Sequence, residues 1–95
     1  MKKFIIERDL PGAGNMTAEE LQDIAKTSIS SMSVLGKPYT WIESFVTADK
    51  IFCIHEAEDE EVIRQHSSCA KFPVNNIAEI KVIINPATLR DTCNY

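Results

Sequence analysis

Two histidines and a set of carboxylates are the side chains of this 95-residue chain that are best suited to chemistry. His55 and His66 are its only imidazoles. Two neutral imidazoles together with a carboxylate form a good site for a borderline divalent cation such as Ni²⁺ or Zn²⁺. The residue types therefore predict a candidate metal site made of His66, Glu7, His55 and Glu43.

Each of these residues also has an interpretation without a metal, and both interpretations stay open at this level. A histidine in a small core is often satisfied by a hydroxyl or a carbonyl group. Glu7 can form a strand-end ion pair with Arg8 or Lys81. Glu43 can belong to the polar rim of an interface in which Trp41 packs.

Other sequence patterns predict little chemistry. The three cysteines, an odd number with no CxxC pair, are expected to be reduced thiols; they are Cys53, Cys69 and Cys93. The Pro11–Gly14 loop lacks the Lys-Ser/Thr of a phosphate-binding loop. Ser44 and His55 have no visible third member of a hydrolase triad.

The elements that must position these residues follow from periodicity and from helix-capping signals. Thr17 and Glu20 have the spacing of a capping box, and Gly36 suits the end of the helix that they begin. A second helix is expected from about residue 59 to residue 70, before Lys71-Phe72-Pro73. Alternating apolar residues predict four strands, at 3–9, 39–46, 51–57 and 77–84.

This order, βαββαβ, predicts an α+β protein of the ferredoxin-like class. Right-handed crossovers place two helices on one face of a four-stranded antiparallel sheet and leave the other face open. The length allows one domain, residues 1–95, with an ordered core at about 3–88 and a C-terminal tail at 89–95.

A tight turn centred on Ala48 and Asp49 predicts the register of the second and third strands. Ile42 then lies opposite His55, and both face the helices. His66 lies on the apolar stripe of the second helix and faces the sheet. The two imidazoles are therefore expected to meet between helix and sheet.

The same register places larger side chains on the open face, where Trp41, Glu43 and Phe45 lie beside Phe52 and Ile54. A monomer would expose these residues as a large apolar patch. We expect the open faces of two copies to pack together, which gives a homodimer of the dimeric α+β barrel type.

Composition and charge exclude several classes of partner. Hydrophobic residues make up 44% and charged residues 25% of the chain, as in ordinary folded domains. The formal net charge is −4 and no basic cluster exists, so we expect no nucleic-acid partner. The apolar run Phe4–Ile6 stops at Glu7, too early for a signal peptide or a membrane span. The chain is expected to be cytoplasmic, without a membrane partner.

Several motifs together resemble a family of small bacterial domains of unknown function that includes a nickel-binding protein. They are FIIERDLPGAG, MTAEELQDIAKTS, WIESFVTADKIFCIHEAEDEEVIRQH and EIKVIINPAT. The resemblance extends from about Phe4 to Thr88 and implies a dimeric ferredoxin-like αβ-barrel and nickel binding. Positions that match the family pattern are Glu7, Arg8, Trp41, Asp49, Lys50, Cys53 and His66. Two positions differ, since relatives often have His at Glu43 and Tyr at His55.

Three functions are compatible with these observations. The first is a dimeric protein that binds Ni²⁺ or another divalent transition metal and uses no organic cofactor. The second is a small enzyme, monooxygenase-like or isomerase-like, with His66 as general acid/base, Arg8 as anion anchor and Trp41 at the ligand. A deep apolar pocket lined by His66 would favour the second. The third is a regulatory module that acts through its dimer face alone.

Overall fold

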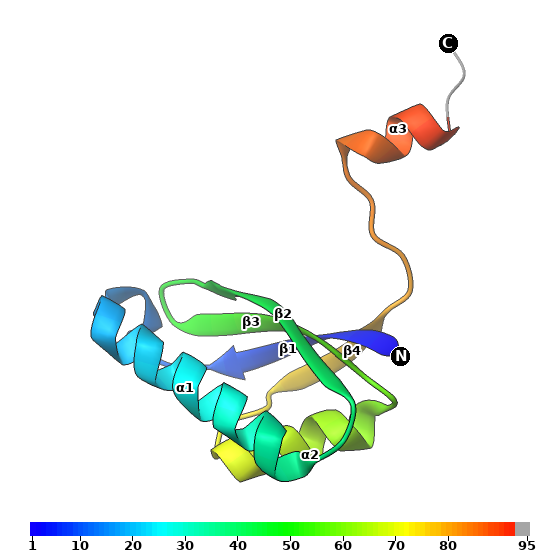
Figure 1. Cartoon of the computed structure of the whole chain (residues 1–95). Coiled ribbons are helices and arrows are strands. Elements are labelled where there is room, and N and C mark those ends of the chain that lie inside the picture. The colour runs from blue at the N-terminus through cyan, green and yellow to red at the C-terminus, as the bar shows by residue number, and fades with distance from the viewer. Residues whose placement is uncertain (93–95) are drawn as a thin grey trace.

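Four antiparallel strands form one sheet in the order β2-β3-β1-β4, and two helices lie across one face of it (Figure 1). The structure is a computed structural model that describes residues 1–92. The strands are β1 (Lys2–Asp9), β2 (Tyr39–Val46), β3 (Lys50–Ala57) and β4 (Asn76–Ile80). The covering helices are α1 (Ala18–Leu35) and α2 (Glu60–Ala70). The predicted α+β, ferredoxin-like topology is confirmed.

Local capping fixes where the two helices begin and end. The Thr17 hydroxyl accepts a hydrogen bond from the Glu20 amide, and the Glu20 carboxylate accepts one from the Thr17 amide, which completes the predicted capping box. Gly36 ends α1 with φ of 66°, a left-handed conformation that costs glycine little. The Asp59 side chain caps α2 by accepting from the Val62 amide.

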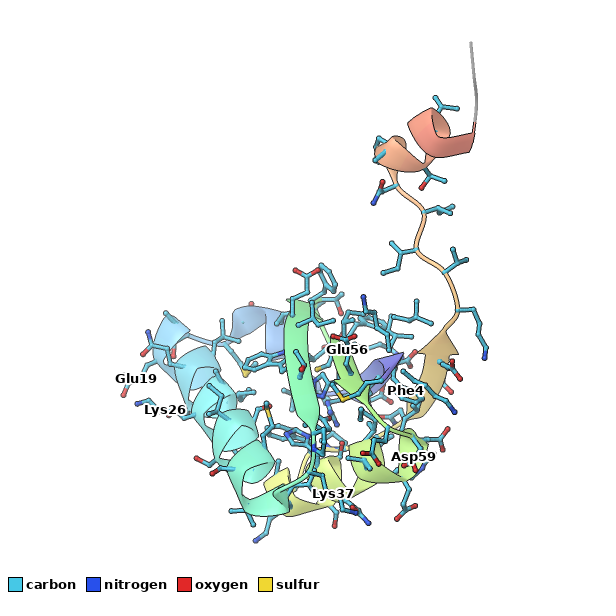
Figure 2. All side chains as sticks on the ribbon, turned by 45° about the vertical axis from the view of Figure 1, so that its right-hand side comes forward. Phe4, Glu19, Lys26, Lys37, Glu56 and Asp59 are labelled. Atoms are coloured by element: carbon cyan, nitrogen blue, oxygen red, sulfur yellow. The ribbon has the colours of Figure 1, made fainter. Side chains whose placement is uncertain are left out.

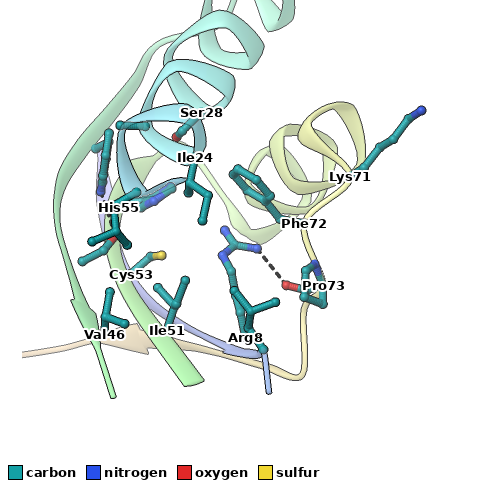
Figure 3. Close-up of a pocket in the computed structure, with 15 residues that line it drawn as sticks. Arg8, Ile24, Ser28, Val46, Ile51, Cys53, His55, Lys71, Phe72 and Pro73 are labelled. Atoms are coloured by element: carbon teal, nitrogen blue, oxygen red, sulfur yellow. Dashed lines mark hydrogen bonds between the residues drawn. The ribbon is translucent and has the colours of Figure 1, made fainter. Parts of the chain in front are cut away.

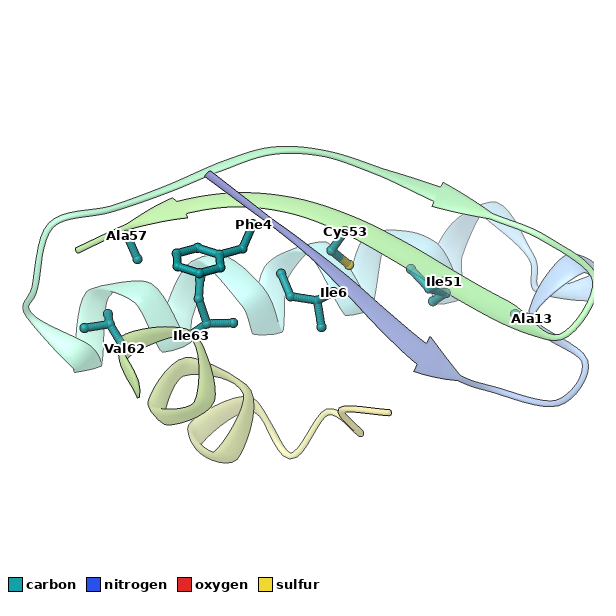
Figure 4. Packing of buried hydrophobic residues seen from close by; sticks show 8 residues of the cluster. All are labelled: Phe4, Ile6, Ala13, Ile51, Cys53, Ala57, Val62 and Ile63. Carbon is teal, nitrogen blue, oxygen red and sulfur yellow. The ribbon is translucent and has the colours of Figure 1, made fainter. Parts of the chain in front are cut away.

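The apolar core lies between the sheet and the helices (Figure 4). Alternation along β1 turns Phe4 and Ile6 inward, and Ile51 and Cys53 on β3 share that face. Ile63 of α2 is fully buried against them. The small core therefore depends on a few large side chains.

A bulge in β2 changes which of its residues face the helices. The predicted pairs Ser44–Cys53 and Val46–Ile51 are present, but Trp41 rather than Ile42 lies opposite His55. Ile42 is the extra residue of the bulge, and its side chain is 43% exposed. Because an added residue reverses the alternation on one side of it, Tyr39 and Trp41 turn toward the helices. The prediction that Trp41 lies on the open face is wrong for this reason.

The fourth strand is shorter than predicted because its partner ends first. Lys3 pairs with Ile80, and only Lys2 precedes Lys3 in β1. The next residues, 81–85, lead away from the sheet to a short helix, α3 (Pro86–Thr92), and their side chains project beyond the domain (Figure 2). The sequence pattern did not predict α3, which covers part of the expected tail. Residues 93–95, and with them Cys93, lie outside the described residues.

Within residues 1–92, no helix is both long enough and apolar enough to cross a membrane.

Candidate functional site

The two histidines meet between the sheet and the helices, as the sequence predicts. His55 comes from β3 and His66 from α2, and their ring centroids are 5.4 Å apart in an edge-to-face arrangement. His55 is 2% exposed and His66 is fully buried. The fold therefore holds two imidazoles in contact in a dry interior.

Tyr39 completes this cluster through the β2 bulge. Its ring stacks on His66 at a centroid distance of 4.6 Å, and its hydroxyl is hydrogen-bonded to Nδ1 of His55. Burial raises the pKa of Tyr39 well above its usual range, so the hydroxyl keeps its proton and donates a hydrogen bond to Nδ1 of His55. Sequence analysis missed Tyr39 because an unbroken register places it on the open face.

Both imidazoles are neutral near pH 7. Burial, the neighbouring His66 and the Arg8 guanidinium together lower the pKa of His55 to about 3. Burial also lowers the pKa of His66. A hydrogen bond to the Ser28 carbonyl raises this pKa, but the effect of burial is larger. Nε2 of His66 lies 3.1 Å from that carbonyl oxygen and must donate to it, which leaves Nδ1 with a free lone pair. Among the described residues, this Nδ1 has no hydrogen-bond partner.

Arg8 is a buried cation without a carboxylate partner in the described part of the chain. It is 4% exposed, and its Nη1 donates to Ser67 Oγ at 3.0 Å and to the Pro73 carbonyl at 2.9 Å. The Phe72 ring lies 5.3 Å from its Cζ atom, within cation–π distance. Its Nε and Nη2 atoms have no partner among residues 1–92. These two nitrogens form one edge of the guanidinium.

A largely apolar cavity of about 440 Å³ lies beside Arg8, between the sheet and the helices. Figure 3 shows the guanidinium between Phe72 and Pro73 on one side and Ile24 and Cys53 on the other. Trp41 also lines the cavity, with its indole N–H held by Ser44 Oγ at 3.0 Å. Other lining residues are Leu10, Leu21, Ala25, Ser28, Val46, Ile51, His55 and Lys71.

His66 does not line this cavity, whereas His55 does. The apolar pocket expected for the enzyme hypothesis therefore exists, but the residue proposed as its acid/base stacks on Tyr39 and does not reach it. A histidine with a pKa of about 3, such as His55, is a weak base at neutral pH. The geometry provides a binding cavity in which the proposed acid/base His66 takes no part.

Glu7 and Glu43 lie on the opposite face of the sheet from the histidines. Glu7 pairs with Lys50 at 2.6 Å, and Asp9 contacts the same ammonium group at 3.1 Å. These hydrogen bonds raise the pKa of Lys50. Glu43 is exposed and lies opposite Ile54 on the open face. The four predicted ligands therefore separate into two pairs with the sheet between them.

The family model described as "Nickel responsive protein SCO4226-like" matches residues 4–80. The chain belongs to this family. A solved structure, that of SCO4226 from Streptomyces coelicolor A3(2), is similar with a TM-score of 0.72 and 13% sequence identity. The match covers 86% of this chain and 99% of that chain. At 13% sequence identity the structural similarity supports the fold alone. No curated protein matches the chain.

The family name raises the question of whether the buried cluster fits a nickel ion. Across residues 1–92, no group of three or more His, Cys, Asp or Glu side chains could hold a metal. The cluster offers one free imidazole nitrogen, on His66, next to an imidazole and a phenol that bond each other. Arg8 adds a positive charge beside them. A dry site with few donors and a neighbouring guanidinium does not fit a resident divalent cation.

Proposed function

We propose that this member of the nickel responsive family binds a small, mostly apolar molecule that carries a carboxylate, in the cavity beside Arg8. One observation supports the proposal above others: a buried guanidinium whose free edge has no counter-ion within residues 1–92 borders an apolar cavity. Leaving a charge buried and unpaired is costly, and a ligand carboxylate would remove that cost.

The free edge has the geometry of a carboxylate receptor. Nε–H and one Nη2–H point the same way and can donate in parallel to the two oxygens of a carboxylate. Nη1 is held on the other side by Ser67 and Pro73, so the orientation of the group is fixed before a ligand arrives. This pre-organisation favours a planar carboxylate over a point charge.

The rest of the cavity suits a hydrocarbon or aromatic body. Ile24, Ile51 and Trp41 present apolar surface, and the cavity volume is in the range of small-molecule sites. Nε and Nη2 are covered from water by the surrounding side chains. Binding therefore includes a shift of those side chains, after which the carboxylate meets the guanidinium in a dry environment.

A comparison of octanoate with 1-octanol by titration calorimetry tests this proposal, because the two share a chain and differ in the head group. We expect octanoate to bind about 10- to 100-fold more tightly, as hydrogen bonds to a charged group imply. Arg8→Met should remove this preference. Lys71→Met is the matched control, since Lys71 is an exposed cation that also lines the cavity, and it should keep the preference.

Arg8→Met is also expected to fold, because a buried charge replaced by an apolar side chain of similar length is often neutral or stabilising. Its thermal unfolding midpoint should equal or exceed that of the wild type. Equal affinity for octanoate and octanol in the wild type would contradict the proposal, as would an Arg8→Met variant that folds and keeps the preference.

Nickel binding is the second candidate function, and the family description is the observation that favours it. Because the buried cluster does not fit the ion, we expect calorimetric titration with Ni²⁺ to give the same result for wild type and His66→Phe. Weaker binding by His66→Phe would place the ion at the imidazoles and overturn this expectation. A loss confined to Glu43→Gln would place it on the open face.

A further inference from the structure

The Tyr39 hydroxyl fixes which nitrogen of His55 carries the proton. Within residues 1–92 this hydroxyl is hydrogen-bonded to Nδ1 of His55 and to no other group. A neutral imidazole has one N–H donor and one acceptor nitrogen. The ring of His55 is neutral near pH 7, because burial lowers its pKa to about 3. Since Nδ1 accepts from Tyr39, the proton of His55 lies on Nε2.

The ring edge of His55 that carries Nε2 borders the cavity. Tyr39 and His66 pack against His55 with ring centroids 5.1 and 5.4 Å away. Neither of them lines the cavity, whereas His55 does. Nε2 lies across the five-membered ring from the Tyr39 contact at Nδ1, so the Nε2–H faces the cavity. It donates to no acceptor among the described residues.

The cavity wall therefore holds two buried donor groups that still need acceptors. The indole N–H of Trp41 is already bonded to Ser44 Oγ. In the described part of the chain, Nε and Nη2 of Arg8 and Nε2 of His55 have no partner. A buried donor without an acceptor costs free energy, and a ligand with acceptors at both places removes that cost.

The sheet register sets how far apart the two donor groups are. In the pairing of β1 with β3, Phe4 lies opposite His55 and Arg8 lies opposite Ile51. The backbone positions of Arg8 and His55 are therefore four residues apart along the strands, about 13 Å at the rise of a β-strand. The long side chain of Arg8 spans part of this distance, and Figure 3 shows His55 on the same side of the guanidinium as Cys53. The two acceptors of a ligand must accordingly be separated by several bonds.

We infer that the cavity ligand is an oxo-carboxylate, whose carboxylate binds Arg8 and whose ketone oxygen, several bonds away, accepts a hydrogen bond from Nε2 of His55. The inference rests on the proposed function and narrows the ligand class from a plain carboxylate to one with a second acceptor. A ketone fits because its oxygen only accepts. An amine at the same place would bring a further donor to a donor.

Calorimetric titration with octanoate and with oxooctanoates that carry the ketone at carbon 4, 5, 6 or 7 tests this inference. We expect at least one ketone position to bind about 3- to 10-fold more tightly than octanoate, the effect of one neutral hydrogen bond. His55→Phe should remove this gain and keep the preference for octanoate over 1-octanol. His66→Phe is the matched control, since His66 is also buried but does not line the cavity, and it should keep the gain.

Nuclear magnetic resonance of the ¹⁵N-labelled wild type tests the donor without any substitution. At neutral pH, Nε2 of His55 should be protonated and Nδ1 should not, and the Nε2–H signal should shift more with the best oxooctanoate than with octanoate. A protonated Nδ1 would overturn the inference, as would a gain that His55→Phe keeps.

The outcomes separate this inference from the proposed function. If octanoate binds more tightly than 1-octanol but no oxooctanoate binds more tightly than octanoate, the oxo-carboxylate inference is wrong and the carboxylate site stands. If wild type does not prefer octanoate to 1-octanol, both are wrong.

Discussion

Protonation of His55 alone is expected to remove roughly 3 kcal/mol from the free energy of unfolding when the pH is lowered from 6.5 to about 4. The pKa of His55 is about 3 in the folded protein, against 6.5 for the unfolded chain. Between these values the unfolded state binds a proton and the folded state does not. Stability is therefore fully present above pH 6.5 and decreases as the pH falls toward 3. His66, whose pKa is also lowered by burial, acts in the same direction.

Urea denaturation at a series of pH values measures this effect, with His55→Phe as the comparison. Carboxylates also titrate in this range, so the informative quantity is the wild-type curve minus the variant curve. That difference should have a slope of about 1.4 kcal/mol per pH unit, the value for one proton. His55→Phe also leaves the Tyr39 hydroxyl unpaired, which lowers the whole curve without changing its slope. Parallel curves below pH 6.5 would show that His55 is not buried as a neutral group.

The second large effect concerns the apolar core. Ile63→Ala is expected to lower the free energy of unfolding by about 2 to 5 kcal/mol, because it removes buried methyl groups and leaves a cavity. Ile63 is fully buried where α2 meets the sheet. A domain of this size has a total stability of only about 5 to 15 kcal/mol, so the variant should be close to the limit of folding.

Ile29→Ala is the matched control for this substitution. Ile29 lies on α1 and is 58% exposed, so its truncation should change stability by less than about 0.5 kcal/mol. Both variants can be compared with wild type by urea denaturation, with attention to whether the dependence on denaturant stays the same. A similar loss for the two isoleucines would contradict the packing described for α2.

The topology could be predicted from the sequence because the signals for it are local. Thr17 and Glu20 specify the start of α1, and alternation in β1 and β3 specifies which side chains are buried. His55 and His66 meet because each lies within an uninterrupted periodic segment, β3 for His55 and α2 for His66. Each of these inferences depends on a few neighbouring residues.

The features that could not be predicted depend on pairing between distant segments. The bulge at Ile42 has no glycine or proline to indicate it, yet it brings Tyr39 and Trp41 under the helices. The end of β4 follows the end of its pairing with β1, at the pair of Ile80 with Lys3. The free edge of Arg8 is defined by Ser67 and Pro73, which are far away in the sequence.

The position of Trp41 also makes the wall of the cavity visible to spectroscopy. The chain has one tryptophan, and the structure places it beside the space proposed for the ligand. Selective excitation of the indole therefore reports on that wall without a label or an engineered probe. The emission wavelength of the indole, and the accessibility of the indole to a quencher, should follow how much water the cavity holds. Changes in residues 81–92 should leave both nearly constant.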